Sequence, residues 1–201
     1  MEQRSDEWFA IRCGKATGSR IGDIVAKTKT GYGASRANYA AQLVAERLTG
    51  KPAESFSNAA MQWGTDTEPM AREAYEMKQG GYVEEVGFLI HPSIPMTGAS
   101  PDGLVGDDGM LECKCPQTAT HIEYLLGKVV PSKYKPQMTW QMLCAGRKWC
   151  DFISFDPRMP ERHQLFCIRY EFDAAYAAEL EAKVVKFLAE VAKTVAKLEA
   201  L

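Results

Sequence analysis

The strongest constraint on the fold comes from a six-residue segment, residues 110–115 (MLECKC), in which apolar and charged residues alternate. Side chains two residues apart on a β-strand point to the same face. Glu112 and Lys114 therefore lie on one face, while Leu111 and Cys113 lie on the other. The pattern predicts a strand with one apolar face and with a carboxylate beside an amine on the other face.

A second strand is predicted just before it, at residues 103–106, and the loop between the two strands decides where Asp102 points. An even-numbered loop would place Asp102 opposite Cys113 and turn it into the core, because a one-residue slip moves every side chain to the other face. A three-residue loop, with Gly109 as a left-handed bulge, would place Asp102 opposite Glu112. We expect this odd-numbered loop, because glycine suits the bulge.

The rest of the chain divides into helical and strand-like stretches, without repeats or linkers. Helices are predicted at residues 5–12, around 21–25, and at 34–48, 67–80, 118–127, 133–145 and 173–201. Strands are predicted at residues 82–90, 103–106, 110–115, 150–155 and 165–172. Pro69 is expected in the first turn of its helix, where proline is tolerated.

This order of elements predicts an α+β fold in which helices flank a central mixed β-sheet. We interpret the chain as one domain (1–201), with a helical N-terminal part (1–80), a sheet core with helices (81–172) and a C-terminal helix (173–201). The apolar stripe of the last helix suits packing in the core or between subunits. The stripe consists of Leu180, Val184, Phe187, Leu188, Val191, Val195 and Leu198.

Charge and composition limit the classes of function. The formal net charge of −2 argues against a protein that coats nucleic acid through bulk positive charge. The N-terminal sequence does not resemble a signal peptide, and no stretch approaches the ~20 apolar residues of a membrane span. We therefore expect an intracellular protein with reduced cysteines and no membrane partner.

Two acids and a lysine form a pattern that suits phosphodiester chemistry. Mg²⁺ binds one or two carboxylates together with water and phosphate oxygens, and Asp102 and Glu112 could provide these carboxylates. Lys114 could orient or deprotonate the attacking water and offset charge on the phosphorus oxygens. The structural alternative is that Pro-Asp-Gly forms an ordinary turn and that Glu112 and Lys114 are an exposed pair on a strand.

The cysteines allow a second metal hypothesis. Cys113 and Cys115 could bind zinc together with Cys144, Cys150 or His121. However, a C-x-C pair without a second close pair is not a usual zinc spacing, and both side chains are predicted on the apolar face of their strand. Cysteines that act as small buried apolar groups are the better interpretation.

Beyond these short patterns, the sequence resembles the phage lambda-type exonucleases. This family is also called the alkaline or viral-recombinase exonucleases and belongs to the PD-(D/E)xK nuclease superfamily. Six motifs occur in the family's order over about 150 residues, and together they are far more specific than any one of them. They are W-x3-R-x-G-x-x-T-x-S (8–19), W-G-x3-E (63–68), S-P-D-G-L (100–104), L-E-x-K-C-P (111–116), Y-x-x-Q (134–137) and F-D-P-R-M (155–159).

The resemblance implies a metal-dependent active site with a restriction-endonuclease-like core. Asp102 and Glu112 match the metal ligands, helped by the backbone carbonyl of Cys113, and Lys114 matches the catalytic lysine. Glu68 matches an active-site acid at a helix start that supports a second metal through water. The expected cofactor is Mg²⁺ in a two-metal site, with Mn²⁺ as a substitute.

Four further residues match the family's active site and its site for the DNA end. Gln137 matches a glutamine near the active site, and Arg12, Ser19 and Ser100 match residues that hold the 5′-phosphate. Without the resemblance we would interpret them as a surface ion pair (Arg12), helix caps (Ser19, Gln137) and a turn hydroxyl (Ser100). One position departs from the lambda pattern. A further acidic residue of that pattern aligns near Pro92, which has no carboxylate, so the sequence leaves open how the second metal is held.

The resemblance also implies a function. The expected activity is 5′→3′ degradation of linear double-stranded DNA to mononucleotides, which leaves a 3′ single strand for recombination. The expected partners are DNA ends, two further copies of the chain in a homotrimeric ring, and a single-strand annealing protein. The expected location is the cytoplasm of a bacterial host of the phage or prophage. Two alternatives remain, an endonuclease of the same superfamily and a non-catalytic DNA-binding subunit.

Overall fold

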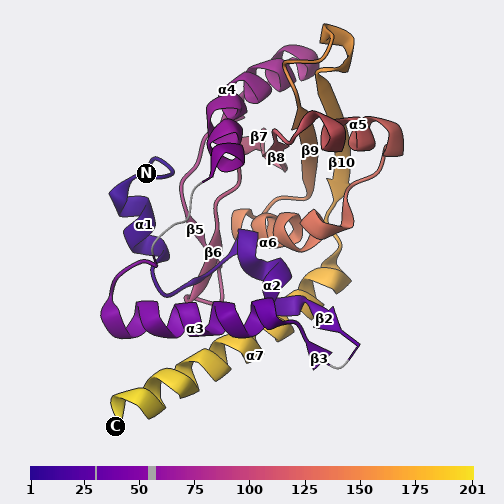
Figure 1. The fold of residues 1–201 in the computed structure, drawn as a ribbon. Coiled ribbons are helices and arrows are strands. Elements are labelled where there is room, and N and C mark those ends of the chain that lie inside the picture. Colours follow the sequence, from indigo (N-terminus) through magenta and orange to yellow (C-terminus); the bar gives the residue numbers. More distant parts are fainter. Residues whose placement is uncertain (30, 54–57) are drawn as a thin grey trace.

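The centre of the molecule is a mixed five-stranded β-sheet (Figure 1). The computed structural model describes residues 1–29, 31–53 and 58–201. In spatial order the strands are β10 (Leu165–Glu171), β9 (Trp149–Phe155), β8 (Gly109–Lys114), β7 (Gly103–Val105) and β4 (Val83–Glu84). Strands β8 and β9 are parallel, and the other neighbours are antiparallel. The predicted central mixed sheet is confirmed.

Two smaller sheets lie outside this centre. One is three-stranded, with β1 (Ala16–Thr17), β6 (Thr97–Ala99) and β5 (Leu89–Ile90) in this order, and the other pairs β2 (Lys27–Thr28) with β3 (Gly31–Tyr32). The single strand predicted at residues 82–90 is wrong, because its two ends pair in different sheets as β4 and β5. Apolar periodicity gives the strand propensity of both ends but carries no information about their partners.

Seven α-helices are present in the described residues. They are α1 (Asp6–Arg12), α2 (Ile21–Val25), α3 (Ala34–Thr49), α4 (Ala59–Gln79), α5 (Thr118–Gly127), α6 (Lys135–Ala145) and α7 (Ala174–Glu199), with the short 3₁₀ turns η1 (Gly18–Arg20), η2 (Ser132–Tyr134) and η3 (Glu161–His163). Ser5 caps α1 by accepting a hydrogen bond from the backbone N–H of Trp8, as the sequence predicts. Helix α3 ends at Gly50, which has a left-handed backbone conformation.

Helix α4 corrects one prediction. It begins at Ala59, eight residues before Thr67, and the side chain of Asn58 caps it by accepting a hydrogen bond from the N–H of Met61. Pro69 therefore lies inside the helix instead of in its first turn. A proline inside a helix costs about 3 kcal/mol. The helix continues because its buried stripe (Thr67, Ala71 and Tyr75) packs on the sheet, and such packing outweighs local propensity.

Helices cover both faces of the central sheet (Figure 1). Helix α4 packs on one face, where Ala71 and Tyr75 contact Leu111 and Ile153. Helices α5 and α6 pack on the other face, and a third core joins α2, α3, α6 and α7. Strand β8 is consequently buried on both sides, and only its last residue, Lys114, is partly exposed.

Candidate active site

The pairing of β7 with β8 decides the geometry of the candidate site. Val105 pairs with Gly109, which leaves a three-residue loop between the strands. The predicted odd register is confirmed, and it sets Asp102, just before β7, level with Glu112 on β8. The expected left-handed bulge at Gly109 is wrong, however, because the left-handed glycine of this loop is Gly106 (φ 54°).

Gly109 is needed for a different reason. A Cβ atom at this position would overlap the indole ring of Trp149 on the neighbouring strand β9. The glycine therefore permits a close approach between the strand and the ring instead of a turn. The sequence shows only that residue 109 is a glycine. The structure shows that it serves the close approach to Trp149 and not a left-handed turn.

Glu112 is the most firmly held side chain of the site. It is fully buried on the face of β8 that points toward α6. Its Oε1 accepts hydrogen bonds from the Lys114 ammonium and from Gln137 Nε2 (2.6 Å), and its Oε2 accepts one from Gln141 Nε2 (2.7 Å). A buried carboxylate needs such partners, because an unpaired charge in the interior is strongly unfavourable.

Gln141 is a site residue that the sequence analysis missed. It is buried on α6, one helical turn after Gln137, and its Nε2 lies 3.3 Å from the carbonyl oxygen of Ser100 as well as near Glu112. Residues four apart on a helix share a face. The spacing Gln137-x3-Gln141 beside a buried acid is the signal that could have revealed it.

Asp102 and Lys114 complete the group around β8. Asp102 Oδ2 accepts a hydrogen bond from the backbone N–H of Cys113 (2.7 Å). Desolvation and repulsion from Glu112 raise the pKa of Asp102 well above its usual range. Desolvation alone would lower the pKa of Lys114, but attraction to Glu112 and Asp102 outweighs it and raises that pKa. The structure thus brings two carboxylates and an ammonium together.

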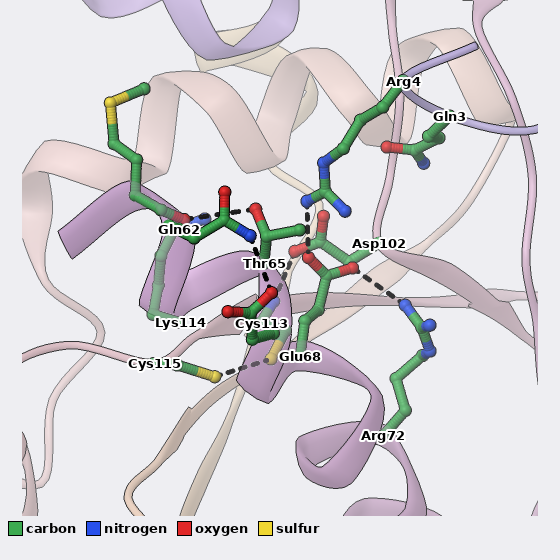
Figure 2. A network of polar contacts seen from close by, with 12 residues as sticks. Gln3, Arg4, Gln62, Thr65, Glu68, Arg72, Asp102, Cys113, Lys114 and Cys115 are labelled. Carbon is green, nitrogen blue, oxygen red and sulfur yellow. Dashed lines mark hydrogen bonds and ion pairs between the residues drawn. The ribbon is translucent and has the colours of Figure 1, made fainter. Parts of the chain in front are cut away.

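Glu68 approaches the same group from α4 (Figure 2). It lies in the middle of the helix, so the expectation of an acid at a helix start is wrong. Its carboxylate forms ion pairs with Arg72 (2.8 Å) and with Arg4 (3.0 Å). Repulsion from Glu68 is one of the causes that raise the pKa of Asp102, and Figure 2 shows the two carboxylates side by side.

A cavity of about 680 Å³ is lined by Arg4, which pairs with Glu68, and it contains two of the three residues expected at the DNA end. Arg12 and Ser19 line it, and the guanidinium of Arg12 stacks 3.5 Å from the ring centroid of Trp8. Desolvation lowers the pKa of Arg12 to about 10. Ser100 contacts Trp8, a residue that lines the cavity, because its Oγ accepts a hydrogen bond from Trp8 Nε1 (2.9 Å). Trp8 therefore links Arg12 to Ser100, and Ser19 lines the same cavity as Arg12.

Comparison with known proteins explains why these motifs occur together. Residues 7–148 match the YqaJ-like viral recombinase domain. This chain belongs to the YqaJ-like viral recombinase family. Its fold is similar to that of LHK-Exo, an alkaline exonuclease from Laribacter hongkongensis, with 48% identity, a TM-score of 0.91, and coverage of 98% of this chain and 97% of LHK-Exo. The LHK-Exo complex with dAMP matches at 49% identity with a TM-score of 0.92 and the same coverage.

A more distant match supports the fold alone. The phage-related exonuclease from Haemophilus somnus 129PT is 15% identical, with a TM-score of 0.70 and coverage of 92% of this chain and 95% of that protein. No match was found among the curated proteins. The fold is thus that of a PD-(D/E)xK-type nuclease, and the family supports a nuclease role in recombination. None of the helices in the described ranges could span a membrane.

The donor set of this viral recombinase site fits a hard divalent cation. Asp102 and Glu112 offer carboxylate oxygens, the backbone carbonyl of Cys113 follows directly after Glu112, and Glu68 adds nearby negative charge. Such oxygen ligands suit Mg²⁺, which also keeps several waters. Within the described part of the chain, no group of three or more His, Cys, Asp or Glu side chains lies so that it could hold a metal ion.

The candidate zinc ligands lie in different parts of the fold. Cys113 packs on the α4 face of the sheet with Cys115 against the same core, whereas Cys150 packs on the opposite face. Cys144 belongs to the third core, and His121 is buried with its ring nitrogens bonded to Ser154 Oγ and the carbonyl of His163.

Pro92, the departure from the lambda pattern, is exposed in the loop after β5.

We predict that Asp102→Asn stabilises the metal-free protein at neutral and alkaline pH. The pKa of Asp102 is raised in the folded state, so the wild type loses stability as the pH rises from the unfolded value of ~3.9 through the folded value. Asparagine keeps the hydrogen bond from the N–H of Cys113 without the charge. Thermal melting in EDTA should give an increase of a few degrees, or about 1 kcal/mol.

The gain should shrink at acid pH, where wild-type Asp102 is protonated. Asp107→Asn, a change in the exposed loop of the same hairpin, is the matched control and should leave the melting temperature unchanged at both pH values. An Asp102→Asn protein that melts lower than wild type at pH 8 would contradict the assigned repulsion.

Proposed function

We propose that this chain is a Mg²⁺-dependent exonuclease that degrades linear double-stranded DNA from the 5′ end. It releases mononucleotides and leaves a 3′ single strand for phage-type recombination in the cytoplasm of a bacterial host. One observation carries the proposal: the register of β7 and β8 sets Asp102 beside Glu112 and Lys114, next to a cavity lined by several cations. The family and the similarity to an alkaline exonuclease support it.

In this proposal Asp102, Glu112 and the carbonyl of Cys113 hold Mg²⁺, and Glu68 supports a second metal through water. Bound Mg²⁺ would supply an activated water and a counter-charge for the phosphoryl oxygens, and Mn²⁺ would substitute for it. Gln137 holds Glu112 Oε1 by a hydrogen bond and so orients that carboxylate. Lys114, whose raised pKa keeps it cationic, orients the attacking water and offsets negative charge in the transition state.

The cavity beside the site is the proposed binding pocket for the 5′-phosphate. Arg12 supplies the positive charge, and Ser19 and Ser100 supply hydroxyl donors. Charge-assisted hydrogen bonds from arginine to phosphate are short and strong. A pocket that recognises the end of a strand, placed next to the cleavage site, favours removal of terminal nucleotides over cleavage in the middle of a strand.

Assembly is the second part of the proposal. A net charge of −2 gives a monomer little electrostatic affinity for DNA. A homotrimeric ring around the duplex would hold the enzyme on its substrate by topology instead. The exposed 3′ strand would then pass to a single-strand annealing protein.

We predict that linear duplex DNA is degraded only in the presence of Mg²⁺ or Mn²⁺ and only from 5′ ends. Asp102→Ala, Glu112→Ala and Lys114→Ala should each abolish cleavage, because each removes a group of the reaction centre. Asp102→Ala should also leave the fold intact, because it removes the repulsion between Asp102 and Glu112. Duplexes labelled separately at their 5′ and 3′ ends measure the polarity, and chromatography of the products measures their length.

Asp107→Ala is the matched control and should retain full activity. Digestion of covalently closed circles would favour the endonuclease alternative. Binding of DNA ends without any cleavage would favour the non-catalytic subunit. Substantial activity in Asp102→Ala would contradict the assignment of the active site to Asp102 and its neighbours.

We predict that DNA with 5′-phosphates is degraded faster than DNA with 5′-hydroxyl ends. Charge-assisted hydrogen bonds contribute ~1.5–3 kcal/mol, which corresponds to roughly ten- to a hundredfold in rate. Arg12→Ala should remove most of this difference, whereas Arg162→Ala in η3 should preserve it. Equal rates of the wild type on both kinds of end would contradict the proposed pocket.

We predict a mass in solution near three chains and long digestion tracts that survive an excess of competitor DNA. Loading should depend on salt, because it requires contacts between cations and phosphates, while dissociation during digestion should depend on salt only weakly. Light scattering gives the mass, and a trap experiment at two salt concentrations gives the processivity. If the protein is a monomer that releases DNA after a few nucleotides, the proposed ring is wrong, but the nuclease proposal stands.

A further inference from the structure

Arg4 has an unusual backbone conformation next to the candidate active site. Its φ is 70°, and Lys128 is the other non-glycine residue with positive φ in the described part of the chain. Lys128 ends α5 in the way that helix ends often do. Arg4 instead lies in the turn just before Ser5, the cap of α1, where a positive φ at an arginine is uncommon. Strained backbone of this kind persists where the surrounding structure imposes it, and it often accompanies functional sites.

Two anchors hold the segment around Arg4 against the residues just before Asp102. Before it, Gln3 Nε2 donates hydrogen bonds to the carbonyl oxygens of Val86 and Pro101, both at 2.8 Å. After it, Trp8 Nε1 donates to Ser100 Oγ at 2.9 Å. The backbone between the anchors has little freedom, and the left-handed conformation of Arg4 directs its side chain toward α4 (Figure 2).

The side chain of Arg4 reaches Glu68 but does not depend on it. Its guanidinium lies 3.0 Å from Glu68 Oε2, and 51% of the side chain is exposed. Arg72, by contrast, is only 14% exposed and pairs with both Glu68 and Glu85. Arg72 therefore already compensates the charge of Glu68. The exposed pair with Arg4 is weak, since solvent screens it, and it can be exchanged for another anion.

Arg4 also lines the cavity that contains Arg12, so it lies between this cavity and the carboxylates. We infer that Arg4 binds the phosphodiester that is cleaved, exchanging Glu68 for a non-bridging phosphate oxygen when DNA enters. This inference rests on the proposed nuclease function. A guanidinium suits the task because its planar donors bind two phosphate oxygens at once, which an ammonium cannot do. The backbone of Arg4 keeps its strained conformation because this conformation orients the guanidinium toward the cleaved phosphodiester.

The test is equilibrium binding of short 5′-phosphorylated duplexes in Mg²⁺, with Lys114→Ala in every protein to prevent cleavage. One duplex is unmodified, and the other carries a single uncharged methylphosphonate at its first internucleotide linkage. Arg4→Gly should weaken binding of the unmodified duplex by about ten- to a hundredfold and leave binding of the methylphosphonate duplex nearly unchanged. Arg4→Lys should restore part of the affinity for the unmodified duplex, because it keeps the charge.

Glycine adopts the left-handed conformation without strain, so Arg4→Gly should melt at the same temperature as its parent or a few degrees higher. The matched control is Lys128→Gly, which also removes a cation and a left-handed side chain. It should show the same thermal behaviour and bind both duplexes like the parent. A binding loss confined to Arg4→Gly is then independent of folding.

Two kinds of result would overturn the inference, and they differ in what else they remove. If the wild type fails to cleave linear DNA in Mg²⁺, the proposed function and the inference fail together. If it cleaves, but Arg4→Gly binds both duplexes like its parent or loses affinity equally for both, the role of Arg4 at the cleaved phosphate is wrong and the nuclease function stands.

Discussion

The pairing of Val105 with Gly109 is the constraint on which the site depends. In a β-ladder the side chains alternate between faces, so a shift of one residue would turn Asp102 away from Glu112. The parallel pairing of β8 with β9 and the helices on both faces hold this register against slippage. The loop contributes a left-handed glycine, and Trp149 contributes a ring that leaves no space for a side chain at position 109.

The fold also has to stabilise negative charge that the site concentrates. Glu112 is buried and receives three hydrogen-bond donors, while Glu68 has two arginines as partners. Asp102 receives one backbone N–H, and its pKa is raised by desolvation and by its acidic neighbours. The least compensated carboxylate is thus one of the proposed metal ligands, where a bound cation would relieve the repulsion that the metal-free protein retains.

Most of the element order and the central acid–lysine group could be predicted from the sequence, because alternation on 110–115 and glycines in the preceding loop are local signals. The start of α4 could not be predicted in this way, since the packing of Ala71 and Tyr75 on the sheet outweighs the free-energy cost of Pro69 inside the helix. Gln141 and Arg4 were also missed. Their proximity to the site arises from tertiary contacts. The four-residue spacing from Gln137 predicts a shared helix face for Gln141 but not its contact with Glu112, and Arg4 has no local signal of this kind.

The site joins two regions with different packing, and this difference suits the proposed function. Glu112 lies on a strand that is buried on both faces, so the group that the proposed chemistry must place accurately sits in closely packed interior. Arg4 lies at the periphery, half exposed and held by two short anchors. Recognition of a DNA strand requires groups that can exchange partners when the substrate enters, and the periphery allows this exchange without disturbing the register of β7 and β8.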